Sequence, residues 1–509
     1  MRGLSGNYLK LYKSISKINN RLYKNSFLIA NNVLSKNTHY FADMPYVLTG
    51  IPRKQRYQIF KLSINSFIFY AKNLVFVLIH FIINVITKVI MPKNNNINFN
   101  NCVLIDTVFY GKNILEEKRF SDSNFRGLQP CLDTLRINYL YTPKWVGTPK
   151  LFTYINIFKI LNKQGCKYIS EFHILTFSDY ISAIYFVLFY PPVLFHSINK
   201  LNRKEKDLIS KSIISDLKRI CVNNYIRYLF GKRIATVFPQ VKKCIVWYEN
   251  QARDKNFIRG LRLNKSIQIY GSQSFIYPTS HLHSYPDENE EKFNLLPDVI
   301  VVNSKKFIQN INVKTRLGPS FRYDYLFDKI ELEKKKDPES IVLLPSYFNE
   351  SFPYIISIVN DVVSTFGNQF EYIIKLHPGF DVIKNKIWYD PRIQIDKSYN
   401  INKVLKSASI IVGTGTSSLI EAAAMGIPVY IIRNDVEFIH HDYIDNNYEP
   451  LIEYVETSFE LCEKIKYYMK HKKISLSNNI AMAQKIKREY FQETTQRSII
   501  NAYDLNDLQ

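Results

Sequence analysis

Acidic residues are almost absent from the first 91 positions, which hold thirteen lysines and arginines but a single acid, Asp43. This segment therefore carries a net charge of +12, half of the chain's +24. Strong basic charge is typical of proteins that meet an anionic membrane surface or a nucleic acid. Because no RNP-like, zinc-finger or helix-turn-helix signature accompanies it, we expect no nucleic-acid partner. A solvated basic face remains the alternative to a membrane-apposed one.

Paired cysteines are also missing. The six cysteines lie far apart, and no two of them have the C-x-x-C spacing. This pattern fits neither a zinc site nor a disulfide framework, and it favours a reducing cytoplasm. The opening residues lack the apolar core of a signal peptide, so none is expected.

A long uninterrupted apolar run is lacking as well. The strongest membrane candidate, residues 73–87, has fifteen residues without a formal charge and is bounded by Lys72 and Lys88. A spanning helix needs roughly 20 apolar residues, so we interpret this run as a helix that lies on a membrane or is buried. A second run, residues 181–198, contains Pro191 and Pro192 and is interpreted as core. We predict that residues 1–100 form a basic helical region, peripheral at the inner face of the cell membrane and apposed to its anionic surface.

From residue 101 onward, short apolar runs alternate with helical segments, which indicates a parallel α/β sheet. "CVLID" (102–106), "CIVWYE" (244–249) and "DVIVVN" (298–303) are predicted strands. Residues 101–328 are therefore predicted to form one Rossmann-like domain. The charged run at 329–340 is expected to be a linker.

After this run the alternation starts again. "IVLLPS", "YIIKL", "SIIVGTG" and "PVYIIR" are predicted strands, and residues 338–495 a second Rossmann-like domain whose last helix crosses back to the first. The predicted fold class is α/β, with two Rossmann-like domains and an N-terminal basic helical region. Ligands of such folds bind at the carboxyl ends of the strands, so we expect a cleft between the two sheets.

A loop rich in glycine, threonine and serine follows the strand that ends at Val412 and leads into a helix that Gly426 ends. Free N–H groups, hydroxyls and the positive end of the helix dipole together suit a phosphate. Ser418 and Glu421 also spell a capping box, S-x-x-E, so a purely structural cap is the alternative. The phosphate-binding candidates are Gly413, Thr414, Gly415, Thr416, Ser417 and Ser418.

A histidine stands at the end of another predicted strand, in "YIIKLHPG". Pro378 and Gly379 already explain a turn there, so the sequence around His377 does not by itself separate a functional histidine from an incidental one.

The run "LIEAAAMGIPV", residues 419–429, resembles the donor-binding helix of GT-B glycosyltransferases, in which a glutamate commonly holds the nucleotide ribose. Glu421 is the matching position. Many retaining enzymes of this fold carry another glutamate eight residues earlier, where this chain has Gly413, so the resemblance disfavours that subclass.

"KLHPG" followed about forty residues later by "GTGTSS" is similar to one GT-B group: the bacterial sialyltransferases and polysialyltransferases, the capsule Kdo transferases and the CDP-glycerol glycerophosphotransferases. It covers about ninety residues, 341–433. The resemblance implies that His377, Pro378, Ser417 and Ser418 bind the phosphate of a cytidine nucleotide. It also places the loop of Ser346 and Asn349 against the donor.

The first domain is expected to supply the acceptor side of the cleft. Glu249, at the carboxyl end of a predicted strand, is the candidate base by location and chemistry, since the group's short acidic motif is absent. A surface or ion-paired carboxylate near Arg253 is the alternative reading, and Asp106 is a weaker candidate. The segment around Gln273 and Ser274 resembles surface-carbohydrate biosynthesis proteins and would line the same cleft.

No metal cofactor is expected, because the sequence has no D-x-D motif and a histidine with a helix N-terminus can neutralise a leaving phosphate. The histidines at 281–283 and 440–441 are interpreted as exposed loops rather than metal sites.

The resemblance implies an inverting transferase that moves a sugar, from a CMP-linked nucleotide-sugar donor, to a glycan or lipid-linked acceptor of capsule or lipopolysaccharide. A UDP-sugar or CDP-glycerol-dependent transferase of the same fold remains open. So does an inert GT-B-like protein that binds glycan or acts as a scaffold.

Overall fold

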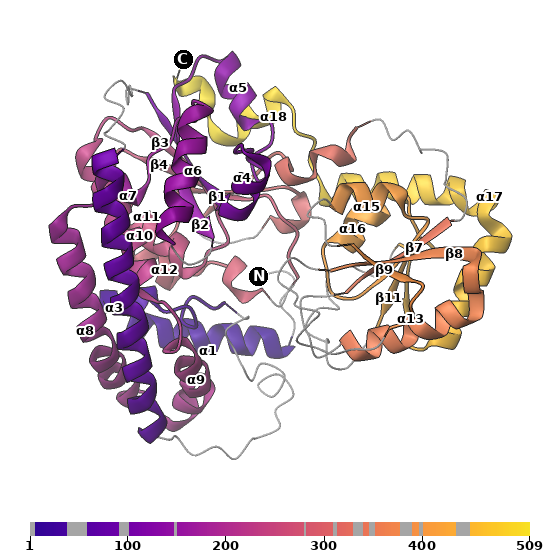
Figure 1. The fold of residues 1–509 in the computed structure, drawn as a ribbon, viewed down its shortest axis with the longest axis horizontal. Helices are drawn as coiled ribbons and strands as arrows, with labels where there is room; N and C mark the ends of the chain where they lie inside the picture. Colours follow the sequence, from indigo (N-terminus) through magenta and orange to yellow (C-terminus); the bar gives the residue numbers. More distant parts are fainter. Residues whose placement is uncertain are drawn as a thin grey trace.

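The computed structural model describes residues 6–37, 59–90, 101–146, 150–278, 281–308, 313–328, 339–345, 352–376, 389–396, 401–433 and 448–508. These residues form two parallel six-stranded sheets, each flanked by helices (Figure 1). The predicted fold class, α/β with two Rossmann-like domains, is confirmed.

The first sheet has the strand order β2-β1-β3-β4-β5-β6, with every neighbouring pair parallel. Its central strands are rich in valine and isoleucine and are buried throughout, as expected for a parallel sheet covered on both faces. The strands are β1 (Val103–Tyr110), β2 (Tyr139–Val146), β3 (Lys243–Trp247), β4 (Gln268–Gln273), β5 (Val299–Val302) and β6 (Lys314–Leu317).

Two strand ends differ from their predictions. The strand expected at 102–106 continues to Tyr110, because it pairs along its full length with β2. The strand expected at 244–249 ends at Trp247, which leaves Glu249 in the following loop.

Helices of several lengths surround the first sheet (Figure 1). They are α4 (Gly111–Glu117), α5 (Leu128–Thr134), α6 (Leu151–Lys163), α7 (Glu171–Ile174), α8 (Phe177–Asn199), α9 (Arg203–Asp216), α10 (Val222–Val237), α11 (Ala252–Leu261), η3 (Leu282–Ser284), α12 (Glu288–Lys292) and η4 (Lys305–Phe307).

The N-terminal elements α1 (Gly6–Leu22), η1 (Ser26–Ala30) and α3 (Ile59–Ile90) pack against this domain. The α1 helix is amphipathic: Tyr12 and Ile15 are buried in the core, whereas its lysines face solvent. The buried Lys36 ammonium pairs with Asp287 at 3.1 Å and with Glu290 at 3.0 Å. These contacts bind residues 6–37 to the first sheet's helical layer.

The second sheet has the order β12-β11-β10-β7-β8-β9 and is also parallel throughout. Its strands are β7 (Glu339–Leu344), β8 (Phe370–Lys375), β9 (Ile393–Asp396), β10 (Ile410–Gly413), β11 (Val429–Ile432) and β12 (Ile452–Val455). Its helices are α13 (Phe352–Phe366), η6 (Gly367–Gln369), α15 (Ile401–Ser407), α16 (Ser418–Ala424) and α17 (Ser458–Tyr490).

The chain passes between the domains twice. The first passage follows β6 and contains η5 (Phe321–Leu326). The second is made by residues 491–495, after which α18 (Gln496–Tyr503) and η8 (Leu505–Leu508) pack on the first domain. There the Tyr503 phenol donates to Ser272 Oγ at 2.9 Å. The two passages are bonded to each other, because Ser320 N donates to Gln492 O at 2.8 Å and Gln492 N to Ser320 Oγ at 2.7 Å.

Candidate active site

Each sheet has one point where the strand order reverses. In the first sheet, the chain moves from β1 outward to β2 and then to β3 on the other side of β1. In the second sheet it moves from β7 to β8 and β9, then to β10 on the other side of β7. Ligands of doubly wound sheets bind outside the carboxyl ends of the strands at such points. The loops after β3 and β10 are therefore the natural candidates, and both were singled out by the sequence.

The loop after β10 is held tightly to β7 at its base. A Cβ atom on Gly413 would lie 2.6 Å from the carbonyl oxygen of Leu344, so only glycine fits this approach. Thr414 N donates to the same oxygen at 3.2 Å, and Thr414 is buried. Gly413 and Thr414 thus anchor the loop, while the residues that follow are free to face a ligand.

The next residues, Gly415, Thr416, Ser417 and Ser418, are partly exposed. Within the described part of the chain, the N–H groups of Gly415, Thr416 and Ser417 donate to no protein acceptor. These three N–H groups, beside two serine hydroxyls, could donate hydrogen bonds to the oxygens of an anion such as phosphate.

The capping box expected as the structural alternative does not form. Ser417, not Ser418, is the N-cap residue of α16, and its side chain makes no capping hydrogen bond. Ser418 is already the first helical residue, one position too late to cap the helix. Capping therefore does not account for the two hydroxyls.

Glu421 is buried on α16. Burial raises the pKa of its carboxyl, and this is opposed by a hydrogen bond from Tyr325, the positive charge of Arg322 and a hydrogen bond from Ser418. The Tyr325 phenol donates to Oε2 at 2.5 Å. The carboxylate is thus held at a fixed place beside the loop, by a residue of the passage between the domains.

Arg322, from η5, lies between the two domains. Its side chain reaches the surface. The loss of water around the guanidinium would lower its pKa, but Tyr323, Glu421, Tyr110 and Glu249 outweigh this and raise it. Among those groups are Glu421 of the second domain and Tyr110 and Glu249 of the first. One guanidinium therefore acts on two carboxylates: that of Glu249, which follows β3, and that of Glu421, on the helix that follows the β10 loop.

Tyr323, next to Arg322, joins the same two sides. Its phenol accepts from Ile276 N, in the first domain, at 3.1 Å. Burial raises its pKa to about 12, against the charge of Arg322 and a hydrogen bond with the Ser417 side chain. The η5 segment therefore places aromatic hydroxyls and one cation directly against the loop after β10.

Glu249 lies two residues beyond the end of β3 and is half-buried. Its Oε1 accepts from Trp247 Nε1 at 3.0 Å and its Oε2 from Gln251 Nε2 at 2.6 Å. Burial, followed by the charge of Asp254, raises the pKa of Glu249 above its ordinary value. A carboxylate with a raised pKa, open to solvent at a switch point, has the properties of a proton acceptor.

The alternative reading of Glu249, an ion pair with Arg253, is not what the structure has. The Arg253 guanidinium donates instead to the carbonyl of Trp145 at 2.9 Å. Asp254 caps α11 as a capping box with Gln251, and its Oδ1 accepts from Lys144 at 2.6 Å. Arg253 and Asp254 are therefore held by other partners, and Glu249 has no ion pair with Arg253.

Asp106 was a weaker candidate for the same role, and its place in the structure does not suit it. It lies in the middle of β1, not at its end, and is fully buried. It pairs with the Arg227 guanidinium and, at 3.5 Å, with Lys144, and it accepts from Thr142 Oγ1 at 3.1 Å. Asp106 is the centre of an ionic network in the core of the first domain.

Gln273 and Ser274 are likewise turned inward. Gln273 Nε2 donates to the carbonyl of Ser284 at 3.1 Å, and Ser274 Oγ bonds to Ser272 Oγ at 2.8 Å. Both residues are buried, so the prediction that they line a cleft is wrong.

Four further candidates, Ser346, Asn349, His377 and Pro378, lie outside the described residues. The described chain runs up to Pro345 after β7 and to Leu376 after β8. Since β8, β7 and β10 are consecutive strands of the sheet, these two segments start from the same edge as the Gly413–Ser418 loop.

The sequence missed three residues of η5: Arg322, Tyr323 and Tyr325. They follow β6 in the stretch "GPSFRYDYLF", which has an arginine among aromatic residues in a passage between domains. That combination is the only signal the sequence offers for them.

Among the described residues, no group of three His, Cys, Asp or Glu side chains is placed to hold a metal ion. One histidine interpretation was wrong: His283 is buried in η3, not exposed in a loop.

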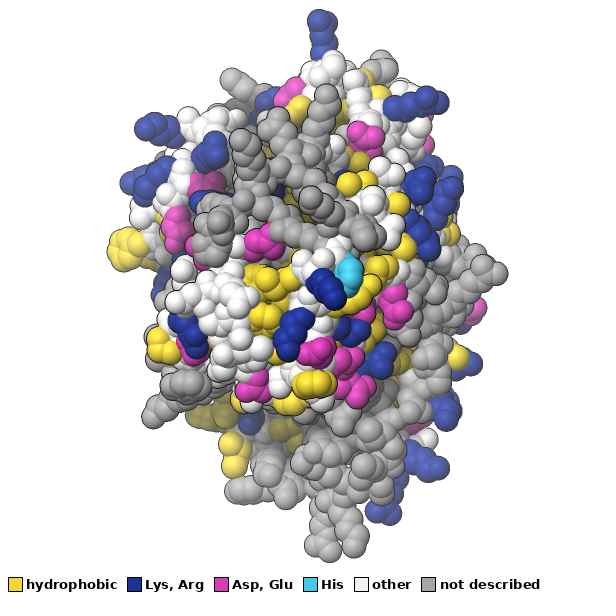
Figure 2. Space-filling view, turned by 90° about the vertical axis from the view of Figure 1, so that its right-hand side faces the viewer, with side chains coloured by type: hydrophobic (Ala, Val, Ile, Leu, Met, Phe, Trp, Pro, Cys, Tyr) yellow, Lys and Arg dark blue, Asp and Glu magenta, His cyan; other side chains and the backbone are white. Residues whose placement is uncertain are grey.

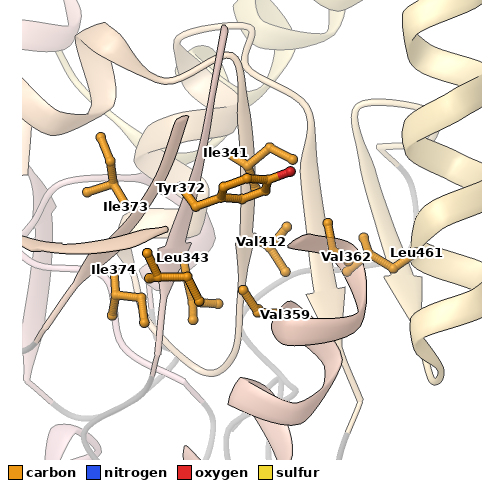
Figure 3. Close-up of a pocket in the computed structure, with 10 residues that line it drawn as sticks. Ile341, Leu343, Val359, Val362, Tyr372, Ile373, Ile374, Val412 and Leu461 are labelled. Carbon is orange, nitrogen blue, oxygen red and sulfur yellow. The ribbon is translucent and has the colours of Figure 1, made fainter. Parts of the chain in front are cut away.

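The second domain also has a small internal cavity of about 10 Å³ (Figure 3). It lies between the sheet and its helices and is lined by apolar side chains such as Leu343, Val362 and Leu461, with Tyr372. It has room for one water molecule at most, so it is a packing gap and not a substrate site.

No family model and no curated protein matches the chain. Among solved structures, it is similar to UDP-GlcNAc 2-epimerase from Neisseria meningitidis bound to UDP-GlcNAc, with 11% identity, 79% of this chain and 99% of that chain covered, and a TM-score of 0.46. The glycotransferase of kitacinnamycin has 10% identity, coverages of 80% and 98% and a TM-score of 0.43. MurG of Acinetobacter baumannii has 9% identity, coverages of 80% and 99% and a TM-score of 0.42. At this level of similarity, a function has to be argued from the residues of the chain itself.

Proposed function

We propose that this protein is a glycosyltransferase of the GT-B type, which transfers a sugar from a nucleotide-activated donor to a hydroxyl of an acceptor glycan or lipid-linked glycan. One observation carries the proposal: Glu249, after β3, and Glu421, on the helix that follows the Gly415–Ser418 loop after β10, both act on the pKa of Arg322. The two reversal points thus bring a proton acceptor and an anion site to one arginine.

On the donor side, the nucleotide phosphates bind at the N–H groups of Gly415, Thr416 and Ser417 and the hydroxyls of Ser417 and Ser418. Glu421 then accepts from the ribose hydroxyls, with its carboxylate held in place by Tyr325. Arg322 supplies the positive charge that a departing nucleotide needs. His377 and Pro378 complete this site in the sequence group that the chain resembles.

On the acceptor side, Glu249 accepts the proton of the attacking hydroxyl. The acceptor oxygen attacks the anomeric carbon from the face opposite the leaving phosphate, so the sugar's configuration inverts. The new glycosidic bond forms as the bond to the nucleotide phosphate breaks, and the nucleotide leaves with both electrons of that bond. Each domain acts on one substrate: the first domain, through Glu249, acts on the acceptor, and the second domain acts on the donor.

The donor we favour is a CMP-linked sugar, because the His-Pro and Thr-Ser-Ser motifs stand in the order found in the cytidine-nucleotide group. The acceptor would then belong to capsule, lipopolysaccharide or a similar surface glycan assembled at the cytoplasmic face of the membrane. The basic segment 1–91 supports that location by its charge.

Thermal-shift measurements with CMP, CDP, UDP and their sugar conjugates test the proposal. We expect CMP or CDP to raise the melting temperature, by mass action on the folded state. Stabilisation by UDP alone would instead point to a UDP-sugar, and CDP-glycerol would reveal a glycerophosphate transfer. If none of these ligands stabilises the protein, it is an inert GT-B-like protein, and the enzyme proposal fails.

A further inference from the structure

Two helices of the first domain expose long apolar faces to solvent. By length and composition, residues 64–89 of α3 and the whole of α8 (Phe177–Asn199) could cross a membrane. The helices pack against each other along the edge of the domain, on the left of Figure 1. Their outward faces therefore adjoin.

The inward face of α3 is bound to the domain by polar contacts. Asn73 Oδ1 accepts from the N–H groups of Cys221 and Val222, both at 2.9 Å. Asn84 Nδ2 donates to the carbonyl of Phe172 at 2.9 Å, and His80 bonds to the Tyr180 phenol at 2.8 Å. These hydrogen bonds fix one face of α3 against the first domain. Only its opposite face can contact a partner outside the protein.

That opposite face is a stripe of large apolar side chains at helical spacing. Of the 25 large hydrophobic side chains that are exposed among the described residues, eight lie on α3 and six on α8. Phe67 is 75% exposed, Val89 76% and Phe177 66%. We call this surface the α3–α8 face; it comprises Ile64, Phe67, Leu74, Val75, Leu78, Ile82, Val85, Val89, Phe177, Ile181, Ile184, Tyr185, Leu188 and Phe189.

A soluble surface does not usually gather apolar side chains in this way. The face of the second domain seen in Figure 2 has basic, acidic and apolar side chains interspersed. The α3–α8 face is thus unusually apolar for a surface that meets water.

The charged side chains at the border of the α3–α8 face are almost all basic, which bears on the kind of partner that this face suits. The exposed charged side chains on α3 whose positions are described are Lys72 and Lys88, and Lys200 follows α8. The one acid within α8, Asp179, is buried and paired with Arg233 at 2.6 Å. Lys218 and Arg219, which touch α3 through their carbonyls, are exposed as well.

We propose that the α3–α8 face docks on an anionic lipid bilayer, with both helices lying in the plane of the interface. The apolar stripe enters the acyl region, and the bordering cations contact the lipid headgroups. A second copy of this chain is disfavoured as the partner, because it would bring the same row of cations against itself.

This surface differs from the one expected from the sequence. The run at 181–198 was interpreted as core, yet half of α8 faces outward beside α3. On α1, by contrast, the lysines form a solvated basic face. The docking surface is thus made by two helices that begin more than one hundred positions apart, and its existence does not depend on the proposed sugar transfer.

Vesicle co-sedimentation of the full chain tests the proposal directly. We expect the protein to sediment with vesicles of phosphatidylglycerol and phosphatidylcholine, and to bind phosphatidylcholine alone much less. The double variant Leu78→Glu with Leu188→Glu should bind about tenfold more weakly, since it places two charges in the stripe. Both positions are exposed, at 58% and 48%, so folding should be unaffected and can be checked by circular dichroism.

The matched control is Phe459→Glu, which puts the same charge on an apolar side chain that is 75% exposed on α17 of the second domain. It should bind vesicles as the unmodified chain does. Brominated lipids should quench a tryptophan at Leu78→Trp but not one at Phe459→Trp.

Three results would overturn the proposal. One is equal vesicle binding by the double variant and the control, and another is no binding by the unmodified chain. The third is a dimer in sedimentation velocity that the double variant abolishes while vesicles remain unbound, which would make the partner a second copy. Nucleotide binding in the thermal-shift assay is read separately, so a failed docking proposal leaves the proposed function standing.

Discussion

The Tyr325 phenol donates a hydrogen bond of 2.5 Å to the buried carboxylate of Glu421. Tyr325 belongs to the passage between the domains, and Glu421 to the helix that follows the candidate phosphate loop. The position of this carboxylate is therefore fixed by the segment that joins the two domains. This coupling makes several outcomes predictable.

Tyr325→Phe removes this donor and leaves the buried Glu421 carboxylate short of a partner. We expect the free energy of unfolding to fall by about 2 kcal/mol, as for other hydrogen bonds to charged groups, and nucleotide affinity to weaken with it. Urea unfolding and nucleotide titration measure the two effects. The control is Tyr354→Phe, whose phenol bonds at the surface to the carbonyl of Glu456 and should change neither. Unchanged stability in Tyr325→Phe would contradict the importance of the bond.

Glu249→Gln keeps the side chain's size but removes the proton acceptor. Transfer should slow by about 10²–10⁴-fold while nucleotide binding stays as it was. Rate assays with saturating donor and a separate nucleotide titration distinguish the two. A variant that also lost nucleotide affinity would show that Glu249 shapes the donor site instead.

Arg322→Gln should change how the rate depends on pH. Burial raises the pKa of Glu249, and the Arg322 charge opposes this, so its loss raises that pKa further. A base works only when deprotonated, so the rate rises with pH through the pKa of Glu249, and this rise should move to higher pH in the variant. Arg316→Gln, an arginine paired with Asp504 away from the site, serves as the control. If the pH–rate profile of Arg322→Gln is unchanged, the charge of Arg322 does not act on Glu249 in the reaction.

Ser417→Ala combined with Ser418→Ala removes two hydroxyls from the loop. If both donate to a phosphate, nucleotide affinity should fall by about 1–3 kcal/mol, or roughly 5–150-fold. Isothermal titration measures the loss. The melting temperature without ligand should fall as well, because the Ser417 and Ser418 hydroxyls also bond to Tyr323 and Glu421, so the affinity is measured well below that temperature. Ser364→Ala on α13 removes an exposed hydroxyl that bonds its own helix and should have no effect. An affinity equal to that of the unmodified chain would place the phosphate elsewhere.

Asp106→Asn tests the buried network of the first domain. The change leaves the Arg227 guanidinium buried without its carboxylate, which typically costs about 3–5 kcal/mol. Denaturant unfolding measures this, and Glu116→Gln, in an exposed pair with Lys112, should shift stability by less than about 1 kcal/mol. A small effect would contradict the importance of the Asp106–Arg227 pair for stability.

Much of the fold was predictable because strands of parallel sheets are short, apolar and locally encoded. The loop after β10 was found for the same reason: its strand, turn residues and helix are contiguous in sequence. The extension of β1 to Tyr110 was missed because it depends on pairing with β2, about thirty-six residues further along the chain.

The missed and misplaced site residues are those whose role depends on distant partners. Arg322 matters because both domains present negative groups to it, which no local pattern states. Asp106 looked like an acid at the end of a strand because its counter-ions, Lys144 and Arg227, come from elsewhere in the chain. The composition of a segment tells little about which charges it will meet.

The paired passages at Ser320 and Gln492 have a mechanical consequence. One connecting segment would let the two domains bend and twist freely. Two connecting segments that are hydrogen-bonded to each other resist twisting far more than bending. The softest relative motion of the two domains is then rotation about this one line. Rotation about this line would move the Gly415–Ser418 loop relative to Glu249, with Arg322 on the connecting segment between them.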